Sequence, residues 1–159
     1  MSKVVATQAG EDDPLLLDRQ VCFPLYAATN LLNRLYGPVL AKLGLTYPQY
    51  LVMLVLWEHQ VQSVGELGAR LYLDSGTLTP LLKRMEAAGF VTRARDPADE
   101  RRVLVTLTAE GKVLRERALH VPETMANGYR PDDVDSLRES VRQLVSTLAQ
   151  HKTRPPATE

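Results

Sequence analysis

The sequence predicts a mainly α-helical fold with one small β-hairpin. Apolar residues recur at helical spacing through most of the chain, two β-branched runs past its middle alternate instead, and polar or proline-containing turns separate these segments. With 159 residues, of which 45% are hydrophobic, the chain can bury the core of one globular domain. We therefore expect a single domain over residues 1–159.

Two helices are predicted before residue 60. Asp18 is a suitable N-cap for a helix through residues 21–36, and Gly37 with Pro38 predicts a bend or a break after it. Residues 47–59 are almost continuously apolar. This pattern predicts a helix that is buried on most sides and forms the centre of the domain.

Pro24 lies inside the first predicted helix. If Asp18 caps that helix, the proline removes the backbone bond to Gln20 and loosens the first turns. The segment would then have freedom to move. The alternative is a helix that starts later.

Two short helices joined by a tight turn follow. Ser63 and Glu66 form a capping box at the start of the first helix, and a turn near residues 72–74 leads to the second, which Gly89 ends. After it, residues 90–95 and 102–107 alternate around a polar loop, which predicts a hairpin with a charged tip. This order of elements is that of a winged helix-turn-helix.

The last part of the chain is predicted to be helical again. Thr108 caps a helix that Pro122 and Gly128 interrupt, and Pro131 suits the first position of a final helix. The apolar residues of this final helix form one long stripe that ends at Leu148. A stripe of that length on a terminal helix needs a partner.

The middle of the chain is basic although the net charge is zero: residues 70–117 carry ten Lys and Arg against seven Asp and Glu. On the second short helix, small polar residues precede two cations, as in a helix that enters the major groove. Arginines flank the hairpin tip, and arginine is the residue type that enters a narrow minor groove. The candidate DNA-binding residues are Ser75, Thr77, Thr79, Lys83, Arg84, Arg93, Arg95, Asp99, Arg101 and Arg102.

The alternative for these residues is an ordinary solvated surface in which Asp99 merely pairs with Arg101. Such a pair can also fix the shape of the tip.

A single cysteine and three scattered histidines predict neither a metal site nor a cofactor. Without a signal peptide or an apolar stretch of about 20 residues, we expect a cytoplasmic protein that does not enter a membrane.

Four stretches of the sequence resemble a known family. The string DERRVLVTLT, with Asp99-x-Arg101 followed after five residues by Leu107-Thr108, is similar to the wing signature of the MarR family of dimeric winged-helix regulators. Two further stretches resemble the family's peroxide-sensing OhrR branch (organic hydroperoxide resistance regulators): LTYPQYLVMLVLWE (45–58) and LYLDSGTLTPLLKRME (71–86). A fourth, QVCFPLY, matches that branch's sensor-cysteine segment.

The resemblance covers residues 15–148 and implies an intertwined homodimer. Residues 15–45 and 108–150 would be dimerisation helices, residues 46–107 the winged helix-turn-helix, and residues 1–13 and 153–159 flexible ends. It also implies a repressor, not an enzyme, that binds a palindromic operator in double-stranded DNA.

Cys22 is the only cysteine, and packing is the ordinary explanation for such a residue. The resemblance instead implies a redox sensor whose thiolate is stabilised by Tyr26, Tyr36 and Tyr47. Tyr26 is one turn from Cys22, whereas Tyr36 is fourteen residues away, about 21 Å along a straight helix. Tyr36 could therefore meet only the partner subunit's Cys22. The alternative for the tyrosines is core packing.

An organic hydroperoxide would oxidise Cys22 to a sulfenic acid. Some members of the branch have a second cysteine where this chain has Asn127, so the lasting product here would be a mixed disulfide with a small cellular thiol, a cyclic sulfenamide or overoxidised sulfur. Two alternatives remain open. One is a regulator of the same family that responds to a phenolic or other small ligand, and the other is a thiol peroxidase.

Overall fold

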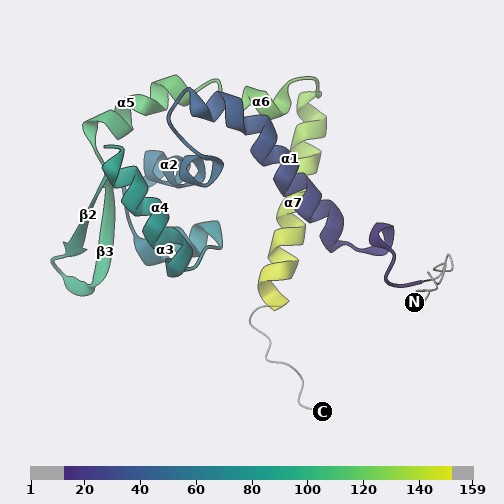
Figure 1. The fold of residues 1–159 in the computed structure, drawn as a ribbon, viewed down its shortest axis with the longest axis horizontal. Coiled ribbons are helices and arrows are strands. Elements are labelled where there is room, and N and C mark those ends of the chain that lie inside the picture. Colours follow the sequence, from purple (N-terminus) through teal and green to yellow (C-terminus); the bar gives the residue numbers. More distant parts are fainter. Residues whose placement is uncertain (1–12, 152–159) are drawn as a thin grey trace, which may run out of the picture. The chain divides into compact units, whose positions relative to one another are not determined.

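The computed structural model describes residues 13–151, which form two units that divide between Ala118 and Leu119 (Figure 1). In chain order the elements are η1 Leu17–Arg19, α1 Cys22–Ala41, α2 Tyr47–His59, β1 Val61–Ser63, α3 Val64–Leu71, α4 Ser75–Ala87, β2 Val91–Asp96, β3 Asp99–Leu107, α5 Ala109–Ala118, α6 Glu123–Ala126 and α7 Pro131–His151. The predicted mainly helical fold with a hairpin wing is confirmed. We predicted flexible ends at residues 1–13 and 153–159. Apart from Asp13, these residues lie outside the described range.

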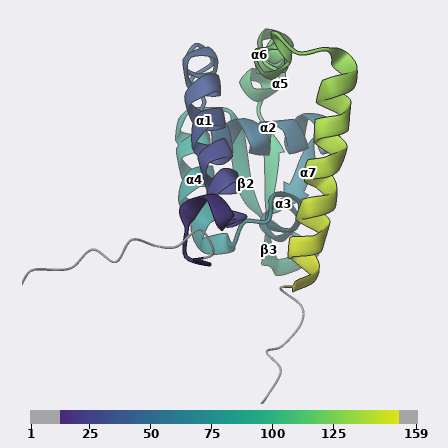
Figure 2. The ribbon, with the colours of Figure 1, turned by 90° about the vertical axis from the view of Figure 1, so that its right-hand side faces the viewer.

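Helix α2 forms the centre of the first unit. Its residues Val52, Met53 and Leu56 are fully buried, and the helix contacts α1, α3, α4 and the sheet. It runs across the direction of α1 (Figure 2). The predicted central helix is therefore confirmed.

The sheet is antiparallel, with β3 between β1 and β2. Val61 pairs with Thr106 on one side of β3, and Val91 pairs with Leu107 on the other. We did not predict β1, because three residues are too few to give a recognisable alternation. Since β1 continues directly into α3, the sheet and the helix-turn-helix share a junction.

Side-chain caps start α3 and α5 where the sequence predicts them. Ser63 Oγ accepts a hydrogen bond from the Glu66 N–H at 3.2 Å, and a Glu66 carboxylate oxygen accepts one from the Ser63 N–H at 2.7 Å. Thr108 Oγ1 accepts from the Gly111 N–H at 3.0 Å. The predicted capping box and the predicted Thr108 cap are both confirmed.

The start of α1 differs from the prediction. Asp18 lies in η1, and α1 begins at Cys22 after Val21, which provides no side-chain cap. The first N–H groups of any helix lack a partner within it, so Pro24 in the first turn costs α1 no backbone bond. The predicted Asp18 cap is therefore wrong, and the alternative of a later start is correct.

We predicted a bend or a break at Gly37 and Pro38. The break is wrong, because α1 continues through both residues to Ala41. A proline ring clashes with the Cβ of a helical residue that precedes it, and Gly37 has no Cβ. Beyond the proline, Leu40 is fully buried and Leu43 nearly so. Burial of each such side chain contributes about 1.5–3 kcal/mol, which offsets the roughly 3 kcal/mol cost of an internal proline.

Large apolar side chains remain exposed on the first and last long helices. Helix α7 begins at Pro131 as predicted, and its apolar stripe is open to solvent in the single chain. The exposed apolar residues are Val21, Phe23, Tyr26, Leu31 and Leu35 at α1 and Leu137, Val141, Val145 and Leu148 on α7. Apolar surfaces of this extent mark interaction sites. Within residues 13–151, no helix combines the length and apolar character that crossing a membrane requires.

Helix α5 passes very close to the backbone that precedes β2. A Cβ added at Gly111 would collide with the carbonyl oxygen of Phe90 and lie 3.2 Å from Leu107 Cδ2. The Gly111 carbonyl also accepts a hydrogen bond from Trp57 Nε1 on α2 at 2.8 Å. The absence of a side chain at Gly111 therefore sets how closely α5 approaches α2 and the sheet.

We predict that Gly111→Ala lowers the free energy of unfolding by about 1–3 kcal/mol, because the backbone must shift to admit the methyl group. The matched control is Gly65→Ala on α3, whose added Cβ meets only Ser63 Oγ, at 4.0 Å, and which should lose no stability. Urea unfolding followed by circular dichroism at one protein concentration measures both. Equal stabilities of the two variants would contradict the prediction.

Candidate nucleic-acid interface and thiol site

Helix α4 presents a polar face at its N-terminal end, while Leu78, Leu81, Leu82 and Met85 bury the opposite face. A carboxylate oxygen of Asp74 accepts a hydrogen bond from the Thr77 N–H at 2.7 Å and caps the helix. This bond lowers the pKa of the Asp74 carboxyl. The predicted residues on this helix are all exposed: Ser75, Thr77, Thr79, Lys83 and Arg84.

A hollow of about 700 Å³ lies between the first turns of α3 and α4 and the hairpin β2–β3, which we call the wing. The structure brings five of the predicted DNA-binding residues to its walls: Ser75, Thr79, Arg93, Arg101 and Arg102. The other five lie on the same elements but outside these walls: Thr77, Lys83, Arg84, Arg95 and Asp99. Glu66 also lines the hollow, and we did not predict it there.

The wing tip is shaped by an ion pair between near neighbours. Arg101 donates from Nε to Asp99 Oδ1 at 3.0 Å and from an Nη to Asp99 Oδ2 at 3.2 Å. These bonds hold the pKa of the Asp99 carboxyl below its usual range, so the carboxyl is ionised at neutral pH. The Arg101 side chain is nevertheless 90% exposed. It can reach a ligand in front of the tip while Asp99 restrains it.

A bulge places the tip arginines outside the regular strand pairing. The β2–β3 ladder pairs Arg95 with Val103 and then Asp96 with Asp99, so residues 100–102 have no partner on β2. An Nη of Arg95 donates to the Glu100 carbonyl at 2.6 Å across this bulge. Because the register shifts here, residues 100–102 do not follow the regular alternation of a paired hairpin.

Arg93 ties the wing to the end of α4. Its backbone N–H donates to one carboxylate oxygen of Glu86 at 2.9 Å, and its guanidinium donates to the other at 3.0 and 2.6 Å. The side-chain bonds from Arg93 lower the pKa of Glu86. Because the Arg93 side chain is only 23% exposed, this contact holds the wing, and its predicted contact with DNA stays a prediction.

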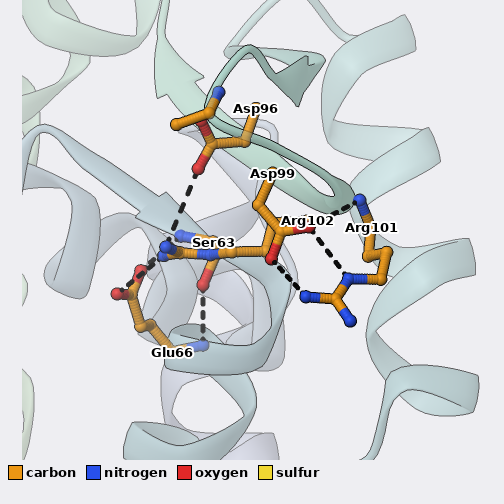
Figure 3. A network of polar contacts seen from close by, with 7 residues as sticks. Ser63, Glu66, Asp96, Asp99, Arg101 and Arg102 are labelled. Carbon is orange, nitrogen blue, oxygen red and sulfur yellow. Dashed lines mark hydrogen bonds and ion pairs between the residues drawn. The ribbon is translucent and has the colours of Figure 1, made fainter.

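Arg102 connects the wing to the start of α3 (Figure 3). One Nη lies 3.1 Å from Glu66 Oε1, and the other lies 3.7 Å from Asp96 Oδ2. We predicted a role for Glu66 only in its own capping box, because a residue 36 positions away from Arg102 leaves no local pattern. Glu66 and Asp96 are therefore members of the site that we did not predict.

Cys22 is exposed and occupies the first position of α1. The N-terminus of a helix carries partial positive charge and favours a nearby anion. Tyr26 follows one turn later and is also exposed, as are the apolar neighbours Val21 and Phe23. The thiol thus lies on an accessible, largely apolar part of the helix.

Two of the predicted tyrosines meet in one aromatic cluster. The ring centroids of Tyr36 on α1 and Tyr47 on α2 are 5.3 Å apart, and Tyr50 lies 6.4 Å from Tyr36. Burial raises the pKa of Tyr36 and of Tyr47, so both phenols keep their protons at neutral pH and can donate hydrogen bonds. Cys22 does not join them within one chain, because fourteen residues of continuous helix, about 21 Å, separate it from Tyr36.

Known proteins match most of the chain. Residues 34–117 match the family described as transcriptional regulator SarA/Rot. The chain is 48% identical to the HTH-type transcriptional regulator TtmR of Methylorubrum extorquens, over 99% of this chain and 80% of that protein. It is 46% identical to the organic hydroperoxide resistance transcriptional regulator of Bacillus subtilis, over 87% of this chain and 95% of the relative.

Solved structures of AbfR from Staphylococcus epidermidis share the fold. Reduced AbfR bound to DNA is 37% identical, with a TM-score of 0.68 over 84% of this chain and 94% of that one. Overoxidised AbfR bound to DNA is 38% identical and has the same TM-score, over 83% and 94%. The chain therefore belongs to the MarR family of winged-helix transcriptional regulators, in its OhrR-like branch.

Proposed function

We propose that this regulator is a repressor that binds an inverted-repeat operator as a homodimer and leaves it when an organic hydroperoxide oxidises Cys22. The observation that carries this proposal is the pairing of Tyr36 with Tyr47, two protonated phenols that the fold assembles far from the chain's own thiol. The similarity to the organic hydroperoxide resistance regulator of Bacillus subtilis supports the same conclusion.

The DNA contact is made by α4 and the wing. Ser75 and Thr79 at the start of α4 line the hollow and would approach base edges, and the exposed Arg101 at the wing tip would enter the neighbouring minor groove. In a two-fold dimer the two α4 helices would lie about one duplex turn, roughly 34 Å, apart. That spacing predicts an operator made of two inverted half-sites.

Dimerisation completes the thiol site. If the α1 helices of two subunits cross antiparallel, Tyr36 and Tyr47 of one subunit face the partner subunit's Cys22. The apolar residues that α1 exposes, Leu31 and Leu35 among them, would be covered by the same contact. Phenol donors then stabilise the thiolate, and the apolar surroundings favour alkyl or lipid hydroperoxides over hydrogen peroxide.

The chemistry requires two steps. The Cys22 thiolate attacks the outer oxygen of the hydroperoxide, the O–O bond breaks, and the alkoxide leaves with a proton as an alcohol, which produces a sulfenic acid. A small cellular thiol then displaces hydroxide from sulfur, which leaves as water, and a mixed disulfide forms. No second cysteine exists in this chain to take the place of the small thiol.

The mixed disulfide is the product most able to release DNA. It adds a whole thiol compound at the dimer contact, whereas further oxidation adds only oxygen atoms. AbfR, which is 38% identical, has been solved in an overoxidised form that is bound to DNA. This supports bulk at Cys22, and not overoxidation alone, as the cause of release. The relatives are named as regulators, which supports a non-enzymatic role for the thiol.

We predict that Cys22→Ser binds an inverted-repeat fragment of its own promoter region as tightly as the wild type, within about twofold, but is no longer released by cumene hydroperoxide with a small thiol present. The serine hydroxyl cannot form the sulfenic acid. Fluorescence anisotropy of the labelled duplex measures both properties. Release of Cys22→Ser by the peroxide would contradict the cysteine mechanism, and absence of sequence-specific binding by the reduced wild type would contradict repression.

A second prediction concerns the phenols. Tyr36→Phe should slow the oxidation of Cys22 by cumene hydroperoxide at pH 7 by about 10- to 100-fold, since a hydrogen bond to a charged group contributes roughly 1.5–3 kcal/mol. Tyr50→Phe is the control, because Tyr50 shares the cluster but has no proposed contact with the thiol. Stopped-flow trapping of the sulfenic acid gives both rates. Equal rates for the two variants would remove Tyr36 from the sensor.

A further inference from the structure

We propose that Arg102 is a positioning residue for DNA binding: it connects the wing to the start of α3 through Glu66 and Asp96, and so fixes the angle at which Arg101 meets DNA. The proposal rests on the DNA-binding function proposed above. It replaces the sequence-based interpretation of Arg102 as a direct DNA contact.

The guanidinium of Arg102 is shared between two elements. One Nη lies 3.1 Å from Glu66 on α3 and the other 3.7 Å from Asp96 at the end of β2. Its side chain is 45% exposed, against 90% for Arg101, whose partner Asp99 is two residues away on the same strand. Arg101 is thus free to reach outward, while Arg102 joins parts of the fold that are distant in sequence.

The Glu66 carboxylate is held in place before it meets Arg102. Its Oε2 accepts from the Ser63 N–H at 2.7 Å, and its Oε1 takes the Arg102 contact at 3.1 Å. The bond to the Ser63 backbone is the main cause that lowers the pKa of Glu66, and Arg102 lowers it further. Glu66 is therefore ionised at neutral pH, and the capping box aims its second oxygen at the wing.

The contact of Arg102 with Glu66 lies where the backbone pairing of the strands ends. The β1–β3 ladder stops at the pair Ser63 and Leu104, and the β2–β3 ladder skips residues 100–102. Beyond Leu104, the contact of Arg102 with Glu66 (Figure 3) links β3 to the first turn of α3, which follows β1. Asp96 connects Arg102 with the turn between β2 and β3, since its Oδ1 also accepts a hydrogen bond from the Ala98 N–H at 2.9 Å.

The sign of an electrostatic effect separates positioning from direct contact. Glu66 lines the hollow that α4 and the wing form, so its negative charge repels DNA phosphates. Removing that charge strengthens DNA binding if charge alone matters. If Glu66 acts through Arg102, the same change weakens binding, because the wing loses its orientation. Exposed ion pairs add little to stability, so the fold itself should tolerate the change.

The experiment uses the full-length reduced protein and a labelled duplex that the wild type selects from a random library. The variants are Glu66→Gln, which keeps an oxygen for the Ser63 N–H, then Arg102→Gln and the double variant. Each single change should weaken DNA binding about five- to tenfold. The double variant should lose no more affinity than the single variant that binds DNA more weakly. Asp96→Asn repeats the test outside the α3 cap and should also weaken binding, although it removes a negative charge.

Salt dependence supplies the second measurement. Arg102→Gln should leave the slope of log Kd against log salt concentration unchanged. Arg101→Gln should lower this slope by about one, the change expected when one phosphate contact is lost. The proposal is overturned if Glu66→Gln and Asp96→Asn bind as tightly as the wild type or tighter. It is also overturned if Arg102→Gln lowers the slope and its effect adds to that of Glu66→Gln. Failure of the unaltered protein to select any duplex would instead overturn the proposed function.

Discussion

The capping box of Ser63 and Glu66 is the interaction on which the DNA-facing half of the molecule depends. Ser63 is buried, ends β1, pairs with Leu104 of β3 and caps α3. Its N–H fixes one oxygen of Glu66, and the other oxygen meets Arg102 in the wing. One residue therefore joins the sheet, the helix-turn-helix and the hairpin, and the geometry of the hollow between them follows from this junction.

A second set of contacts connects the tyrosine cluster with the base of the wing. The Tyr50 ring lies 6.4 Å from Tyr36 and 6.3 Å from Trp57, whose indole N–H donates to the Gly111 carbonyl. Gly111 in turn lies against the backbone of Phe90, one residue before β2 begins. Packed residues therefore connect Tyr36 with the base of the wing, and all of them belong to the first unit.

The features that we predicted correctly are local in sequence. The capping box at Ser63 and Glu66 spans three positions, and its physics is contained in those positions. The break at Gly37 and Pro38 was predicted wrongly because burial of Leu40, a tertiary effect, outweighs the local signal. The contact of Arg102 with Glu66 could not be predicted at all, since only the folded chain brings residues 36 positions apart together. Patterns therefore placed the elements, and packing decided how they join.

The fold separates a part that must stay rigid from a part that can respond. The wing and α4 are held by Arg93 with Glu86 and by Arg102 with Glu66, bonds that keep the DNA-facing groups in one arrangement. On α1, by contrast, only Tyr36 and Leu40 are buried, and both lie in its second half. The first half, which begins at Cys22, has no buried residue in the described structure. In the proposed homodimer, chemistry at the thiol would therefore alter how α1 meets the second subunit and would leave these ion pairs of α4 and the wing intact. In the mechanism that we propose, oxidation therefore changes the spacing of two intact DNA-binding units.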